Sequence, residues 1–257
     1  MPAVAALMPG AEASLALRRT LPTGGSWTLI GCRSAPQLKG ALTSRLIDAV
    51  VFAPTRTPLA EIAALRGAFP QVPWIAFAPF KPDDGPLLLA CHAGEVSLVL
   101  VDGVDNAVAG ELVVRHSAAA NRRGALADAP RVLRLSDPLQ REVWHYLLDR
   151  VDQTVRTGEI AKTLGCSREH LSRQFGAGGA PNLKRVIDLT RIACAASLLR
   201  NPGCDVGSVA RILRFATASH LSATARRIAG VPTRGLAALG PRGVLGNFAK
   251  GKTRSRD

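Results

Sequence analysis

The first 125 residues alternate short apolar runs with longer stretches in which apolar and charged residues recur at helical spacing. The apolar runs predict buried strands over residues 3–8, 27–32, 48–53, 74–78 and 97–101. The intervening stretches predict helices, among them residues 11–21, 35–46, 58–69 and 105–123. Strands that alternate with helices of roughly 10–15 residues are typical of βαβ units, so the pattern predicts a parallel sheet buried on both faces.

From residue 137 onward the apolar positions follow helical spacing alone. Residues 137–154 predict a helix that begins with Asp137 as N-cap and Pro138 in its first turn. Residues 182–202 predict a longer helix, because apolar side chains recur every three or four positions along it. This half of the chain is therefore predicted to be all-α.

Two further segments each combine a short helix, a tight turn and a second helix. Residues 157–175 show this pattern with Gly165 at the turn and Ser167 as N-cap of the second helix. Residues 208–227 repeat it, and the triplet HLS recurs at an offset of 50 residues. Each segment predicts a helix-turn-helix, whose second helix can enter the major groove of DNA.

The charge of the chain is asymmetric. The formal net charge is +14 and the sequence pI is about 10.9. Residues 1–125 contain 11 Lys and Arg against 9 Asp and Glu, whereas residues 126–257 contain 22 against 10. The net charges of the two halves are therefore +2 and +12. We expect a polyanionic partner for the C-terminal half.

The cysteines are few and unpaired in spacing: Cys32, Cys91, Cys166, Cys194 and Cys204. Their odd number and the absence of a CxxC pair argue against a disulfide framework or a zinc site and favour a reducing cytoplasm. No apolar run approaches about 18 residues, so no membrane span is expected. The apolar start lacks a basic n-region and is interpreted as a strand and a helix, not a signal peptide. No metal or cofactor is expected.

The five βα units resemble the receiver domain of response regulators. The resemblance lies in the spacing and in the phrases WTLIGCRSAPQLKGAL, LIDAVVFAP, VPWIAFAPF and AGEVSLVLVDG, which match the second to fifth strands and their surroundings. It implies a flavodoxin-like five-stranded sheet of strand order 2-1-3-4-5. An α/β domain of unrelated ancestry is the alternative.

The positions that carry chemistry in a working receiver are apolar in this chain. A receiver has an acidic pair after strand one to hold Mg²⁺, an Asp after strand three to accept the phosphoryl group, a Thr or Ser after strand four and a Lys after strand five. The corresponding residues here are Met8, Pro9, Ala53, Ala78 and Val101. We therefore expect no phosphorylation, with Ala53 in the place of the phosphoacceptor.

Two helix-turn-helix units joined by one long helix resemble the DNA-binding domain of AraC/XylS-type transcriptional regulators. The resemblance covers about residues 140–239 and includes the phrases LSRQF, RIACAASLL and the closing AGVPTRGL. Together with the receiver-like half and the local composition, it predicts four regions. They are a receiver-like domain (1–125), a linker without a steady apolar period (126–137), a double helix-turn-helix domain (138–240) and a glycine-rich, basic, disordered tail (241–257).

The resemblance also implies which side chains of the first unit meet DNA. They are Arg168, Glu169, Ser172 and Arg173. Arg173 can form bidentate hydrogen bonds to guanine, and Glu169 can accept a hydrogen bond from cytosine N4. His170 is expected to be a half-buried packing residue.

The second unit departs from the family's pattern. Its matching positions are Ala218, Ser219, Ser222 and Ala223, whose short side chains offer methyl contacts or weak hydrogen bonds. Arg226 and Arg227 are interpreted as phosphate clamps, which position the protein without specifying sequence. Arg214 stands where the family usually has Gly at the turn, and Ala225 stands where an aromatic residue normally fills the core. We therefore expect the first unit to dominate base readout.

Cys91 offers a different interpretation of the N-terminal half. Some AraC-type regulators carry a glutamine-amidotransferase-like domain with a Cys at a strand-to-helix elbow, and Cys91 with His92 follows an apolar run. A nucleophilic Cys needs a partner base and a lowered pKa. We prefer a packed cysteine on the fourth helix, because residues 1–125 are few for that fold.

These observations predict a cytoplasmic, sequence-specific transcription regulator that binds double-stranded DNA and is not an enzyme. The N-terminal domain is expected to act as a phosphorylation-independent dimerisation or signal-input module. A homodimer formed through that domain and a contact with RNA polymerase are expected, and no membrane partner is. A nonspecific, nucleoid-like DNA-binding protein is the alternative, because the second reading helix is poor in hydrogen-bonding groups.

Overall fold

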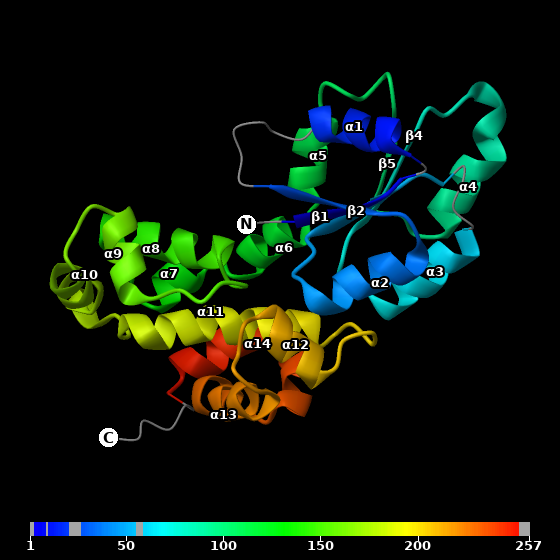
Figure 1. Ribbon diagram of the computed structural model, residues 1–257. Helices are drawn as coiled ribbons and strands as arrows, with labels where there is room; N and C mark the ends of the chain where they lie inside the picture. The colour runs from blue at the N-terminus through cyan, green and yellow to red at the C-terminus, as the bar shows by residue number, and fades with distance from the viewer. Residues whose placement is uncertain (1–2, 9, 21–26, 55–58, 252–257) are drawn as a thin grey trace. The chain divides into compact units, whose positions relative to one another are not determined.

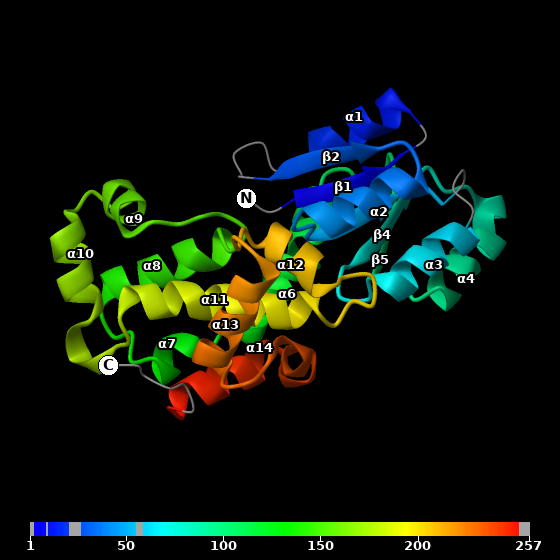
Figure 2. The same cartoon turned by 60° about the horizontal axis from the view of Figure 1, so that its bottom comes forward.

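The computed structural model describes residues 3–8, 10–20, 27–54 and 59–251. The chain divides into two compact units, Met1–Asn121 with Asn201–Gly203 and Arg122–Arg200 with Cys204–Asp257. The first unit contains a β-sheet, and the described residues of the second are helical or lie in connecting segments (Figures 1 and 2). No helix in the described part of the chain is long and apolar enough to span a bilayer.

A parallel sheet forms the centre of the first unit. Its strands are β1 (Ala3–Leu7), β2 (Thr28–Cys32), β3 (Ala49–Phe52), β4 (Trp74–Ala78) and β5 (Leu98–Val101). They lie in the order β2-β1-β3-β4-β5, and every neighbouring pair is parallel. This is the flavodoxin-like order 2-1-3-4-5. The predicted fold class is therefore confirmed for the sheet and for the helical C-terminal half.

Helices cover both faces of the sheet. The helices of this half of the chain are α1 (Ala11–Thr20), α2 (Ala35–Ser44), α3 (Leu59–Ala68), the short η1 (Pro82–Asp84), α4 (Gly85–Ala93), α5 (Ala109–Arg115) and α6 (Ala118–Ala125), the last of which continues into the second unit. α1 and α5 lie on one face, and α2 and α3 on the other (Figure 1). The inner strands β1, β3 and β4 are buried at every residue, whereas the edge strands β2 and β5 are partly exposed. Burial on both faces explains the continuous apolar runs of the inner strands.

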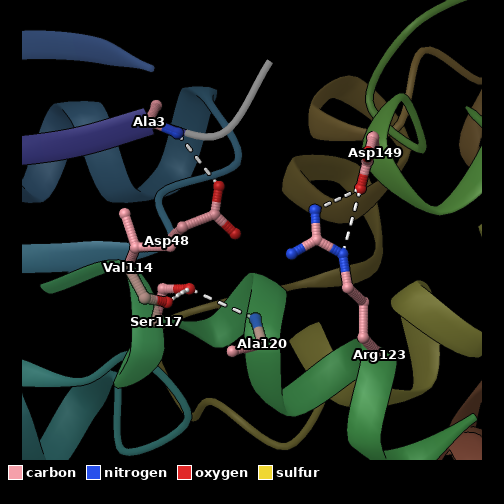
Figure 3. Close-up of polar contacts among 7 residues, drawn as sticks. All are labelled: Ala3, Asp48, Val114, Ser117, Ala120, Arg123 and Asp149. Carbon is pink, nitrogen blue, oxygen red and sulfur yellow. Dashed lines mark hydrogen bonds and ion pairs between the residues drawn. The ribbon is translucent and has the colours of Figure 1, made fainter. Parts of the chain in front are cut away.

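A buried carboxylate organises the amino-terminal edge of the sheet. Asp48 lies immediately before β3 and is fully buried, and its Oδ2 accepts a hydrogen bond from the backbone N–H of Ala3 at 3.0 Å (Figure 3). The backbone carbonyl of Asp48 accepts a second bond, from the N–H of Ala118 at 2.7 Å. A buried polar group is stable only when it is hydrogen-bonded, so the Asp48 side chain holds the start of β1 at this edge. Its backbone carbonyl holds the start of α6 there.

The single helix predicted over residues 105–123 is wrong. The chain forms two helices there, α5 and α6, and Ser117 lies between them. The Ser117 hydroxyl donates to the carbonyl of Val114 at 2.7 Å and accepts a hydrogen bond from the N–H of Ala120 at 3.2 Å (Figure 3). The side chain thus ends one helix and caps the next, in competition with the backbone bonds of a continuous helix.

The second unit begins within α6 and continues through eight further α-helices in its described residues. They are α7 (Ala129–Val132), α8 (Pro138–Asp149), α9 (Thr157–Thr163), α10 (Arg168–Phe175), α11 (Leu183–Leu198), α12 (Val206–Ile212), α13 (Ala218–Ala229) and α14 (Thr233–Ala249). A short turn of 3₁₀ helix, η2 (Ala177–Gly179), follows α10. An ion pair of 2.5 Å between Arg123 and Asp149 joins α6 to α8 (Figure 3).

The long helix α11 is the centre of this unit. It packs against α13 and α14, and Leu189, Ile192 and Ala196 are fully buried. Its N-cap Asn182 accepts a hydrogen bond from the N–H of Arg185 at 2.9 Å, which fixes where the helix begins. The predicted connecting helix between the two helix-turn-helix units is therefore confirmed.

The predicted linker over residues 126–137 is not extended chain. Residues 129–132 form α7, and Leu126, Leu133 and Leu135 are each at least 97% buried. Three buried leucines hold this segment in the core of the second unit, because each removes apolar surface from water. The lack of a steady period, which suggested a linker, reflects a short helix and a tight turn.

The predicted disordered tail is also wrong over its first part. α14 continues to Ala249, with an interruption at Gly240, where φ is 61°. Val244, Leu245 and Phe248 are buried, which accounts for the folding of a glycine-rich and basic segment. The second unit therefore stays folded beyond the predicted boundary at residue 240, and residues 252–257 lie outside the described part.

Candidate nucleic-acid interface

The second helix of the first helix-turn-helix unit, α10, is called here the first reading helix. It has one buried apolar side and one exposed polar side. Leu171 and Phe175 are fully buried, and the expected base-reading residues Arg168, Glu169, Ser172 and Arg173 are all exposed. Ser167 caps the helix by accepting a hydrogen bond from the N–H of His170 at 3.1 Å. The exposed residues therefore occupy one solvent face of a capped helix.

The expectation for His170 is wrong. Its side chain is exposed, because it follows the N-cap by three residues and lies on the same side as Arg173. Leu171, the next residue, takes the core position. His170 is therefore available to the surface that carries the four predicted contact residues.

A buried glutamine anchors the far end of α10. Gln140 on α8 is 1% exposed, and its Nε2 donates to the carbonyls of Phe175 at 2.9 Å and Ala177 at 3.2 Å. Nearby, Nε2 of Gln174 donates to Oδ2 of Asp137 at 3.1 Å. Carbonyls at a helix C-terminus lack partners within the helix, so the Gln140 amide supplies the missing donor. The bond from Gln174 to Asp137 links the same end of α10 to the start of α8.

The turns of the two helix-turn-helix units have the same backbone geometry. In the first, a hydrogen bond donated by the N–H of Cys166 closes the turn around Gly165, whose φ is 65°. In the second, the N–H of Phe215 donates to the carbonyl of Ala210 at 2.8 Å and closes the turn around Arg214, whose φ is 57°. This is the Schellman motif, which needs a left-handed residue at its C′ position. Arg214, which stands where the resemblance places a glycine, therefore adopts the left-handed backbone that favours glycine.

The second reading helix, α13, presents small side chains. Ala218, Ser219 and Ala223 are exposed, and Ser222 is half-buried. Thr217 caps the helix by accepting a hydrogen bond from the N–H of His220 at 3.0 Å. The helix is therefore as well formed as α10, but its exposed face offers fewer hydrogen-bonding groups to a base edge.

The two arginines at the end of α13 differ in their surroundings. Nη2 of Arg227 lies 2.6 Å from Oδ2 of Asp188 on α11, and the Asp188 side chain is only 12% exposed. Arg226 is exposed and forms no ion pair within the described residues. Arg227 therefore has a structural partner that the sequence did not reveal, whereas Arg226 is the freer of the two phosphate contacts predicted there.

A cation also braces the second turn from α11. Arg191 donates from Nε and Nη2 to the carbonyl of Leu213, at 3.2 and 2.6 Å. Its guanidinium carbon lies 3.9 Å from the ring centroid of Phe215, which in turn meets the ring of His220 edge-on. Burial lowers the pKa of Arg191, and the nearby Asp188 partly offsets this. These contacts hold the turn that leads into α13.

The carboxyl edge of the sheet is hollowed in the first unit. The hollow has a volume of about 830 Å³, and the strand-end residues Met8, Ala53 and Ala78 form part of its lining. All three are buried and apolar, and Val101 is half-buried. Pro9 lies outside the described residues. No residue with the chemistry of a phosphoacceptor occupies these strand-end positions.

Charged residues that the sequence analysis missed also line this hollow. They are Arg19, Lys81, Asp84 and Asp102. Oδ2 of Asp84 accepts a hydrogen bond from the N–H of Lys81 at 2.8 Å, and Oδ1 of Asp102 accepts one from Nδ2 of Asn106 at 3.0 Å. Arg19 lies on α1, Lys81 and Asp84 lie at the two ends of η1, and Asp102 directly follows β5. The comparison of receiver positions did not include these four places. Among the described residues no group of His, Cys, Asp and Glu could hold a metal ion.

Cys91 does not have the environment of a nucleophile. It lies inside α4, not at a strand-to-helix elbow, and it is fully buried. Burial raises the pKa of the Cys91 thiol, which disfavours the reactive thiolate. The packed-cysteine interpretation is therefore confirmed, and the amidotransferase-like alternative is contradicted by this placement.

Comparison with known families places a recognised domain on this geometry. Residues 160–236 match a family model described as a helix-turn-helix domain. The match runs from α9 into α14 and includes both α10 and α13, so this segment is similar to a helix-turn-helix domain. The comparison with curated proteins found no match.

One solved structure is similar along most of the chain. Full-length FixJ from B. japonicum aligns at 14% identity with a TM-score of 0.39, covering 87% of this chain and 95% of that one. The fold class stated above rests on the strand order and register of the sheet itself.

Proposed function

We propose that the protein is a sequence-specific DNA-binding transcription regulator in which α10 dominates base readout. The observation that carries this proposal is the exposed face of α10, where Arg168, Glu169, Ser172 and Arg173 project from a helix held at both ends. A rigid helix that presents two guanidinium groups and a carboxylate can discriminate base pairs in the major groove. The position of this helix within the matched segment 160–236 supports the same assignment.

The proposal gives α13 a supporting role. Its exposed residues Ala218 and Ser219, with half-buried Ser222, suit methyl contacts to thymine and weak hydrogen bonds. Arg226 and Arg227 follow on the same helix and are proposed to contact phosphates, with Arg227 also paired to Asp188. The second unit would therefore add affinity more than sequence discrimination.

The first unit is proposed to act without catalysis, as a receiver-like module that does not depend on phosphorylation. The strand order 2-1-3-4-5 and the apolar residues Met8, Ala53 and Ala78 at the strand ends support this role. The module would serve dimerisation or signal input. A homodimer formed through it and a contact with RNA polymerase belong to the same proposal.

In vitro selection of bound DNA with the full-length chain tests the proposal, followed by binding measurements on Arg173→Ala. We expect a loss of about 1–3 kcal/mol in binding free energy on the selected site. The sequence preference should be relaxed at one base pair only. Lys184→Ala, on the exposed side of α11, is the matched control for the loss of one positive charge. An equal loss on every sequence after Arg173→Ala would contradict the base-reading role.

The short side chains of α13 favour a second candidate, a nonspecific nucleoid-like DNA binder. Selection distinguishes the two, because a regulator binds its site roughly 10³-fold or more tighter than random DNA at physiological salt. A ratio near one for the wild-type chain would favour the nonspecific function.

A further inference from the structure

Two arginines of the second unit occupy a backbone conformation that favours glycine. Among the described residues only Glu95, Arg134 and Arg214 are non-glycine residues with positive φ, at 50°, 56° and 57°. Arg134 follows α7 and Arg214 follows α12, each at the C′ position of a Schellman motif. Because a Cβ atom is crowded in this conformation, glycine is the residue of lower energy at both places.

The packing explains the two turns but not the two arginines. Around Arg134 the flanking Leu133 and Leu135 are buried, and around Arg214 the flanking Leu213 and Phe215 are buried. These apolar neighbours force the chain to turn back at the residue between them. The arginine side chains themselves are exposed, and no hydrogen bond or ion pair holds either guanidinium in the part of the chain that the structure describes.

Arg214 lies where a helix-turn-helix approaches DNA. It occupies the turn between α12 and α13, at the position that Gly165 holds in the first unit. The turn and the start of the second helix are the parts of this motif that lie nearest the groove and its phosphates. A guanidinium added to this turn is therefore placed to meet the DNA backbone.

Arg134 lies in a hollow of about 340 Å³ whose charged lining is all positive. The lining residues are Pro130, Arg131, Arg134, Leu135, Ser136 and Arg141. Arg141 is held in place by donating from Nη2 to the carbonyl of Ser136 at 2.5 Å. Asp128 lies 3.7 Å from Arg131, but both side chains are 79% exposed, so solvent screens this pair. The hollow therefore suits an anion.

The hollow adjoins the C-terminal end of α10. A methyl group added to Gly179, just after α10, would lie 3.4 Å from Nη1 of Arg134. α10 has 8 residues, which corresponds to about 12 Å, close to the width of the major groove. If α10 crosses the major groove, its C-terminal end reaches the phosphates at the edge of the groove. The hollow around Arg134 adjoins that end and therefore lies near those phosphates.

We propose that Arg134 and Arg214 bind phosphates of the DNA backbone, with Arg131 and Arg141 completing the site around Arg134. This inference rests on the proposed DNA-binding function and adds two contact points, one of them outside the segment 160–236 that matches the helix-turn-helix family. On this proposal the two arginines supply charge at places where glycine would have the lower backbone energy, and the fold is less stable as a result.

The test uses the full-length chain with Arg134→Gly and Arg214→Gly. Each substitution should raise the Tm by about 2–4 °C through relief of the backbone strain. Each should also weaken DNA binding and make the slope of log K against log salt less negative by about 0.9, the value for one phosphate contact. A residue with a purely structural role would lower both stability and affinity, so the opposite signs are diagnostic.

Two controls isolate the charge from the backbone effect. Glu95→Gly makes the same backbone change at φ 50° in the first unit and should leave the salt slope unchanged. Arg134→Lys and Arg214→Lys keep the charge and should keep the slope. The inference is overturned if the wild type binds DNA and both glycine variants keep its affinity and salt slope. A wild-type chain that binds no DNA would overturn the proposed function itself, and this inference with it.

Discussion

Arg191 holds the second helix-turn-helix turn from the side, with its guanidinium carbon 3.9 Å from the ring centroid of Phe215. The same guanidinium donates to the carbonyl of Leu213 at 2.6 Å, so one side chain of α11 contacts both sides of the left-handed residue Arg214. The strained turn is therefore stabilised by a residue outside both helices that it connects. The first turn has Gly165 in place of Arg214.

Replacing Arg191 should destabilise the second unit. In Arg191→Leu the Leu213 carbonyl loses its donor and Phe215 loses its cation, and we expect unfolding to become easier by about 1–3 kcal/mol. Urea denaturation measures this. Arg191→Lys keeps the charge without the paired donors. Its free energy of unfolding should lie between those of the wild type and Arg191→Leu. An unchanged free energy of unfolding in Arg191→Leu would show that the turn needs no support from α11.

Gln140 should matter for α10 more than its position in the sequence suggests. Gln140→Leu removes the side-chain donor to the carbonyls of Phe175 and Ala177, and we expect a loss of about 1–3 kcal/mol in stability. Hydrogen exchange should show faster opening of α10. Glu142→Ala changes an exposed residue of α8, the helix that carries Gln140, and should leave hydrogen exchange in α10 unchanged. Equal protection of α10 in both variants would contradict the anchoring role.

Arg226 and Arg227 form a matched pair for separating structure from DNA contact. Arg227→Ala removes the partner of Asp188 and should cost about 1–2 kcal/mol in stability. Arg226→Ala should change stability by less than about 0.5 kcal/mol but reduce the salt dependence of DNA binding by one phosphate contact. Denaturation and salt titration of both variants check this. Equal stabilities for the two variants would be evidence against the Arg227–Asp188 contact.

Asp205 should contribute an acid-sensitive part of the stability. It caps α12, and the backbone N–H of Ser208, which lies 2.6 Å from its Oδ1, holds the pKa of the carboxyl below its ordinary value. The unfolded chain therefore binds this proton first. The contribution is complete above about pH 4, the unfolded pKa, and is lost as pH falls through the lower folded pKa. In Asp205→Asn the cap remains, but unfolding measured against pH should lack this component.

The cysteines should differ in reactivity towards a thiol reagent at neutral pH. Burial raises the pKa of Cys204 to about 11 and also raises that of Cys91, whereas Cys166 is half-buried in the first turn. We expect Cys166 to be labelled in the folded chain and the other two only after unfolding. Peptide mapping by mass spectrometry identifies the site. Rapid labelling of Cys91 in the folded chain would reopen a catalytic role for it.

The elements that could be predicted are those whose signal is local. The inner strands are apolar at every position because both faces are covered, and Ser167 and Asp137 mark helix starts through hydrogen bonds to residues two or three positions away. The left-handed turn at Arg214 was predictable for the same reason, since the repeat placed it opposite Gly165. Caps and turns of this kind depend only on residues a few positions apart, so the sequence alone predicts them.

The errors arose where distant contacts decided the outcome. The Ala-rich segment around Ser117 has the composition of one helix. The Ser117 hydroxyl nevertheless ends α5, and the N–H of Ala118 donates to the carbonyl of Asp48, far away in the sequence. The glycine-rich residues after 240 fold because Val244 and Phe248 find a place in the core. Composition describes a segment alone, whereas burial depends on what packs against it.

By itself the sequence determined the parallel sheet, the repeated helix-turn-helix and the basic C-terminal half, because periodicity, caps and charge are properties of neighbouring residues. It also determined that Ala53, in the place of a receiver's phosphoacceptor, cannot be phosphorylated. Only the tertiary structure decided that Gln140 and Arg191 support the two units and that Arg227 is paired with Asp188. It also decided that Arg134 and Arg214 project outward from buried turns. Hydrogen bonds and ion pairs between residues far apart in the chain depend on how helices pack, and no local pattern records that packing.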